Sequence, residues 1–135
     1  MLTYCVTAAA LGAGWFVVLL IPGVTRGWLL ENGWQNLAFL IVSSVLVAVM
    51  CRRFIARADG LRDHLFRAAV LPLLGCFVFL TLWNAWIWIG SHGVANIHDT
   101  LSLYLMGMAA AVWSFFVVGP YGLLCERIMN ALAPQ

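Results

Sequence analysis

Four long stretches without a charged side chain constrain this chain more than any other feature of its sequence. They cover residues 1–25, 32–51, 68–98 and 100–125, and the seven arginines and five acidic residues all lie outside them. Each stretch is at least as long as the ~20 residues that an α-helix needs to cross a bilayer. The sequence therefore predicts an all-α integral membrane protein with four transmembrane helices in a compact bundle.

The composition excludes the other common classes. Hydrophobic residues make up 64% of the chain and charged residues only 9%, whereas soluble domains have about 45–50% apolar and about 25% charged residues. Disordered chains are more polar still. We expect the chain to contact the lipid bilayer and other membrane subunits or further copies of itself, and to bind no nucleic acid.

Turn-forming residues divide the chain into its expected elements. Pro22-Gly23 closes the first span, and Asp59-Gly60 is the turn signal within residues 52–67, which we expect to form a tight helical hairpin. Gly119-Pro120-Tyr121-Gly122 is expected to kink or end the fourth span. The sequence predicts one domain over 1–135, with spans at about 4–21, 35–54, 66–89 and 100–118 and a short tail helix at 123–132.

The arginines predict the orientation of the spans. One arginine lies in the first loop, none in the third loop and one after the last span, while five lie in the hairpin: Arg52, Arg53, Arg57, Arg62 and Arg67. Cytoplasmic loops of membrane proteins carry the excess of Lys and Arg. We therefore expect the hairpin and both termini in the cytoplasm, across a bacterial inner membrane. No basic residue precedes Arg26, so we interpret the first stretch as a span and not as a cleaved signal.

Five polar residues form the candidate site. Asn84 and Ser102 lie within the third and fourth spans, and an amide in hydrocarbon is expected to bond to another helix. The others lie near the third loop: His92, His98 and Asp99. Imidazole and carboxylate groups could ligate a metal or haem at His98 and Asp99, but Asp99 is more simply the N-cap of the fourth helix. We expect no cofactor.

Small residues mark the expected contact faces. Gly12 and Gly14 in the first span, and Gly107 and Ala111 in the fourth, would let neighbouring backbones approach closely. The four cysteines form no C-x-x-C pair and are expected to be free thiols.

No catalytic motif is present, and the inner parts of the predicted spans carry no ionisable side chain. Such side chains are the usual carriers of protons and ions, so a proton-coupled transporter acting alone, or an enzyme working at the bilayer midplane, is disfavoured. We expect a non-catalytic subunit or helper of a larger membrane complex. A transporter or channel component acting as a homo- or hetero-oligomer is the first alternative, and a haem or metal redox subunit using the outer histidines is the second.

Overall fold

The computed structural model describes most of the chain. The described residues are 1–21, 26–27, 30–57, 60–90, 97–113 and 115–133. Within the helices, the description leaves out the side chains of residues 97–99, 110, 111, 113 and 115–118.

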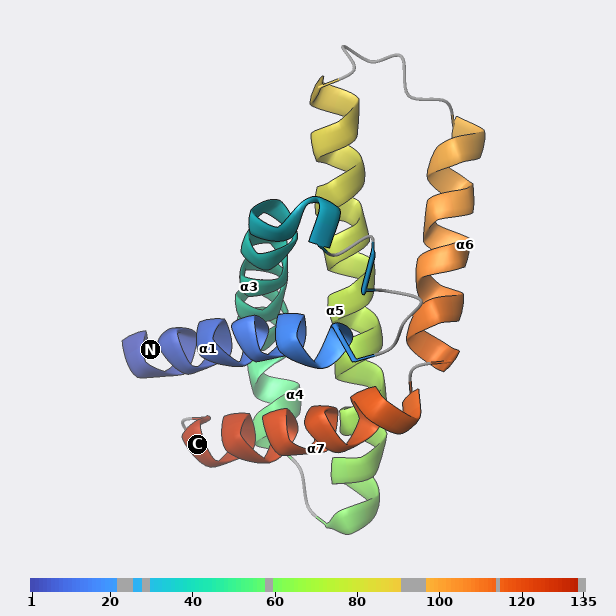
Figure 1. Cartoon of the computed structure of the whole chain (residues 1–135). Coiled ribbons are helices and arrows are strands. Elements are labelled where there is room, and N and C mark those ends of the chain that lie inside the picture. Colours follow the sequence, from blue (N-terminus) through green and yellow to red (C-terminus); the bar gives the residue numbers. More distant parts are fainter. Residues whose placement is uncertain (22–25, 28–29, 58–59, 91–96, 114, 134–135) are drawn as a thin grey trace.

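In this part of the chain the regular secondary structure is entirely helical (Figure 1). Three helices, α1, α3 and α5, are long and apolar enough to cross a membrane, and α6 has a shorter apolar run at Thr100–Ala109. The prediction of an all-helical protein with membrane-length helices is thereby confirmed. The helices are α1 (Leu2–Leu19), α3 (Gly33–Met50), α4 (Arg52–Ala56), α5 (Leu61–Gly90), α6 (Ile97–Trp113) and α7 (Phe115–Leu132).

The end of the chain differs from the prediction. A break at residues 119–122 and a short tail helix were expected, but α6 ends at Trp113 and α7 is an 18-residue helix with Pro120 inside it. Packing against α5 explains the difference. A Cβ atom at Gly122 would lie 2.8 Å from the Ala68 carbonyl oxygen and 3.0 Å from Pro72 Cγ. This close contact holds α7 together across residues that would break an isolated helix.

The helices α1 and α3 form an antiparallel pair. Near one end, the Tyr4 hydroxyl donates a hydrogen bond to the carbonyl of Ala48 at 3.0 Å. Further along, a Cβ atom at Gly12 would lie 2.9 Å from the Cα of Ile41 and from the carbonyl oxygen of Leu40. The backbones therefore meet at Gly12, as expected from its small size.

The long helix α5 lies at the centre of the bundle. Phe39 of α3 packs edge-on against Phe79 and Trp83 of α5, with ring centroids 6.4 and 5.7 Å apart. On α6, a Cβ atom at Gly107 would come within 2.7 Å of the Leu80 side chain. Gly107 thus faces another helix, in agreement with the sequence, whereas the side chain of Ala111 lies outside the description.

The helices α1 and α7 run side by side in opposite directions across α5 (Figure 1). The Tyr121 hydroxyl donates a hydrogen bond to the carbonyl of Leu11 at 2.9 Å and lies over Gly14, while its ring meets Trp15 edge-on at 4.7 Å. One buried cluster closes the chain-terminal end of the bundle: Tyr4, Ala8, Ala48, Ile55, Met129 and Ala133.

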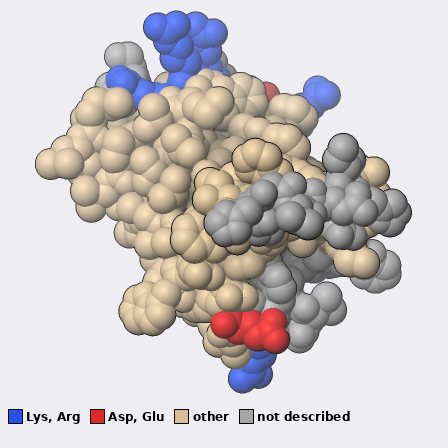
Figure 2. Space-filling model, turned by 90° about the horizontal axis from the view of Figure 1, so that it is seen from above, with Lys and Arg blue, Asp and Glu red and all other residues tan. Residues whose placement is uncertain are grey.

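Over most of one end-on face, the described surface carries no charged side chain. Figure 2 shows basic and acidic side chains only at the margins of that face. In each of the three membrane-length helices, fewer than a third of the residues are buried by the rest of the chain. Much apolar surface is therefore left for lipid or for other membrane proteins.

Replacing Gly12 should test the α1–α3 contact. Gly12→Ala is expected to lower the melting temperature in detergent, at a cost of about 1–3 kcal/mol, because the new methyl group meets backbone atoms that have no rotamer to change. Gly75→Ala is the matched control: nothing lies within 4 Å of a Cβ there, so better helix propensity should leave stability unchanged or raised by up to about 1 kcal/mol. Equal melting of both variants and the wild type would contradict the packing.

Candidate functional site

A buried ionic pair joins α5 to α7. His64 Nδ1 lies 2.8 and 2.7 Å from the two carboxylate oxygens of Glu126. Glu126 is 1% exposed and His64 is 7% exposed, so water does not screen the pair. At these distances a hydrogen bond joins Nδ1 to the Glu126 carboxyl group.

Local sequence positions both partners. Gly60 has a φ of 122°, a conformation that favours glycine, and His64 lies one helical turn beyond it on α5. Glu126 lies one turn beyond Gly122, where α7 closely approaches Ala68. His64 of α5 therefore meets Glu126 of α7, and Ala68 meets Gly122. On each helix the two residues are four positions apart, and they follow in opposite order along the chain.

Sequence reasoning missed this pair. It placed Glu126 in the short tail helix at 123–132 and His64 in the hairpin at 52–67. The signal in the sequence was the four-residue spacing that His64 and Ala68 share with Gly122 and Glu126. This spacing becomes informative only once α7 is known to pack against α5.

Arg67 is also buried, and it joins α4 to α5. Its guanidinium donates a hydrogen bond to the carbonyl of Ile55 at 2.9 Å, and its Cζ atom lies 4.7 Å from the ring centre of Phe54. Carbonyls in the last turn of a helix lack helical partners and attract cations. Arg67, predicted only to set orientation, thus also stabilises the turn of the arginine hairpin, residues 52–67.

The other arginines of the hairpin remain available at the surface. Arg52 is half-buried, and its guanidinium lies 3.1 Å from the sulfur of Met1. Arg53, Arg57 and Arg62 are exposed. The hairpin therefore contains two kinds of arginine. Arg67 is buried and holds α4 against α5, whereas the exposed arginines face outward.

The predicted polar site is only partly described. Asn84 donates its amide to the carbonyl of Leu80, one turn earlier in its own helix, at 3.0 Å. Between α5 and α6, the Tyr104 hydroxyl donates a hydrogen bond to Thr81 Oγ1 at 2.8 Å. A hydroxyl on a long aromatic side chain can reach across the helix contact, and Thr81 offers it an acceptor. Ser102 is half-buried on α6.

The outer histidine cluster remains a prediction. His92 lies outside the described residues, and the description omits the side chains of His98 and Asp99. Since α6 begins at Ile97, Asp99 is the third residue of the helix and not the predicted N-cap. Its charge still lies in the first turn, where the helix dipole favours a carboxylate. Among the described residues, no three His, Cys, Asp or Glu side chains gather as a metal site.

All four cysteines are free thiols, as expected. Burial raises the pKa of the Cys125 thiol to about 12. Thiols react as thiolates, so Cys125 should react slowly at neutral pH. Protein-family models, curated proteins and solved structures gave no match to the chain.

A double-mutant cycle should measure the coupling between His64 and Glu126. Each single variant, His64→Leu or Glu126→Leu, is expected to lose about 3–5 kcal/mol, because the remaining partner stays buried without its counterpart. The double variant should lose much less than the sum of the two single losses, by thermal or denaturant unfolding in detergent. Glu31→Gln, at an exposed acidic residue, should unfold like the wild type. Additive losses would show that the two side chains do not interact.

Proposed function

We propose that this protein is a non-catalytic subunit of a larger integral-membrane complex. One observation carries the proposal: the buried ionisable side chains hold helices together, whereas exposed arginines line the same hairpin. His64, Arg67 and Glu126 are engaged within the chain. Arg53 and Arg57 face outward from this rigid base, where they suit an acidic segment of a partner subunit.

The proposed topology has four spans, with both termini and the arginine hairpin in the cytoplasm of a bacterial cell. The excess of arginines in the hairpin supports this orientation. Exposed tryptophans support it from the opposite end of the bundle, since Trp34 is 86% exposed and Trp88 is 58% exposed, and tryptophan favours the membrane interface. The fourth span consists mainly of α6, whose 17 residues extend about 26 Å.

The spans themselves also support a subunit role. Large apolar side chains remain exposed on the outer surfaces of two helices, among them Val6 and Val17 on α1 and Leu105 and Met106 on α6. In a complex, these surfaces would meet the spans of partner subunits, while the hairpin arginines would fix the partner at the cytoplasmic side.

The intact particle mass tests the subunit proposal. Purification in mild detergent should give a hetero-complex, and Arg53→Glu with Arg57→Glu should release the chain from it because the charge at the contact is reversed. Arg26→Glu is the matched control, since Arg26 is exposed outside the hairpin. A monomer or a homo-oligomer as the sole species, under conditions that keep other membrane complexes intact, would contradict the proposal.

A transporter component is a second candidate, and the buried pair between α5 and α7 favours it. A histidine can act as a proton shuttle, and His64 lies within hydrogen-bond distance of a buried carboxylate. Proton flux into vesicles that contain the purified protein should then be lost in Glu126→Gln and retained in Glu31→Gln. Equal flux in protein-free vesicles and in wild-type vesicles would eliminate this candidate.

Cysteine labelling in intact cells should establish the orientation. The introduced cysteine of Leu61→Cys, which replaces an exposed hairpin residue, should react only with membrane-permeant reagents. The cysteine of Gly27→Cys, in the exposed first loop, should also react with impermeant ones. The four native thiols are half-buried, and the labelling of the unmodified protein gives the background. The reverse pattern would place the arginine hairpin outside the cell.

A further inference from the structure

The helices α6 and α7 pack on different faces of α5. Leu80 of α5 faces Gly107 of α6, whereas His64 of α5 faces Glu126 of α7. These two α5 positions lie about 160° apart around the helix, at 3.6 residues per turn. The chain therefore moves from one face of α5 to another at the break between α6 and α7. The face of α5 that packs against α6 near Leu80 is not covered by α6 in the turns that precede this contact.

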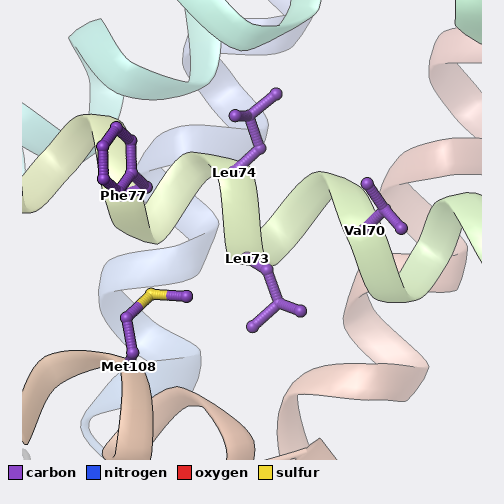
Figure 3. A pocket seen from close by; sticks show the side chains of 5 residues that line it. All are labelled: Val70, Leu73, Leu74, Phe77 and Met108. Carbon is purple, nitrogen blue, oxygen red and sulfur yellow. The ribbon is translucent and has the colours of Figure 1, made fainter. Parts of the chain in front are cut away.

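An apolar groove lies on the uncovered part of α5. Its volume is about 290 Å³, and it is shallow and open to the surface over most of its extent. In the view of Figure 3, Met108 of α6 lies on the same side of the α5 ribbon as Leu73, whereas Leu74 and Val70 extend to the other side. The lining residues are Val70, Leu73, Leu74, Phe77 and Met108.

The groove continues along α5 to an arginine. Residues 62, 66, 70, 73 and 77 are spaced by three or four positions, so they share one face of the helix within about 80° of arc. Phe66 is 60% exposed and Arg62 is also exposed. Among the described residues, none forms an ion pair with Arg62. This strip, Arg62 to Phe77, is apolar along its length and cationic at one end.

We infer that the strip binds one anionic phospholipid of the cytoplasmic leaflet, with an acyl chain in the groove and the phosphate at Arg62. The groove volume is at the lower end of small-molecule sites, which suits a single flexible chain. Arg62 lies about 16 Å along the helix from Leu73, and an arginine side chain can extend toward the interface from its apolar stem. Basic residues beside cytoplasmic ends of spans attract anionic headgroups.

The inference rests on the proposed topology, because the hairpin must face the cytoplasmic leaflet for Arg62 to meet its headgroups. The lipid site and the proposed topology can be disproved independently. Labelling that places the hairpin outside would overturn the topology whatever lipid is bound, whereas loss of lipid specificity would overturn the site in either orientation.

Native mass spectrometry of the full chain in mild detergent tests the site with added phosphatidylglycerol or phosphatidylcholine. The wild type should retain one phosphatidylglycerol and bind phosphatidylcholine more weakly. Arg62→Gln should weaken phosphatidylglycerol binding about fivefold, the effect of one arginine near an anionic surface. Leu73→Trp should remove the bound lipid by filling the groove, and Phe66→Ala should weaken binding through an exposed position that cannot disturb the core.

Arg53→Gln is the matched control, an exposed arginine on α4 outside the strip, and it should bind like the wild type. Equal retention of both lipids, or equal effects of Arg53→Gln and Arg62→Gln, would overturn the inference. A particle of two chains without lipid, separated into monomers by Leu73→Trp, would assign the groove to a second copy and overturn it as well.

Discussion

The buried contact between His64 and Glu126 determines where the C-terminal part of the chain lies. A carboxylate that is 1% exposed must be paired, because an isolated charge in apolar surroundings is far less stable than in water. The nearest turn of α5 provides the partner, and the resulting contact fixes the place where α7 crosses α5 (Figure 1). The packing of α7 against α1 at Tyr121 then follows from the same placement.

Three tyrosine hydroxyls form hydrogen bonds between helices. Tyr4 bonds to a carbonyl of α3, Tyr121 to a carbonyl of α1 and Tyr104 to Thr81 of α5. Helical carbonyls have a second lone pair available. A long side chain with a terminal hydroxyl can therefore link helices whose facing surfaces are otherwise apolar, and it needs no charged group within a span.

The arginines of the hairpin have two structural roles, and the sequence does not show which arginine has which role. Arg67 is buried beneath α4 and holds the turn, whereas Arg53, Arg57 and Arg62 are exposed beside it. A rigid turn that presents several cations favours a contact with an acidic protein segment or an anionic lipid headgroup. Both proposals depend on this separation, and they involve different arginines on different helices.

The sequence by itself determined the helical class, the membrane-length helices, the hairpin turn at Gly60 and the close approach at Gly12 and Gly107. These features depend on runs of apolar residues, on backbone conformation or on the absence of a side chain, which are properties of single segments. Only the tertiary structure decided that Pro120 lies inside α7, that Asn84 bonds within its own helix and that His64 meets Glu126. Each of these depends on which surface a neighbouring helix presents, because a proline, an amide or a buried carboxylate is tolerated only where another part of the chain compensates for it.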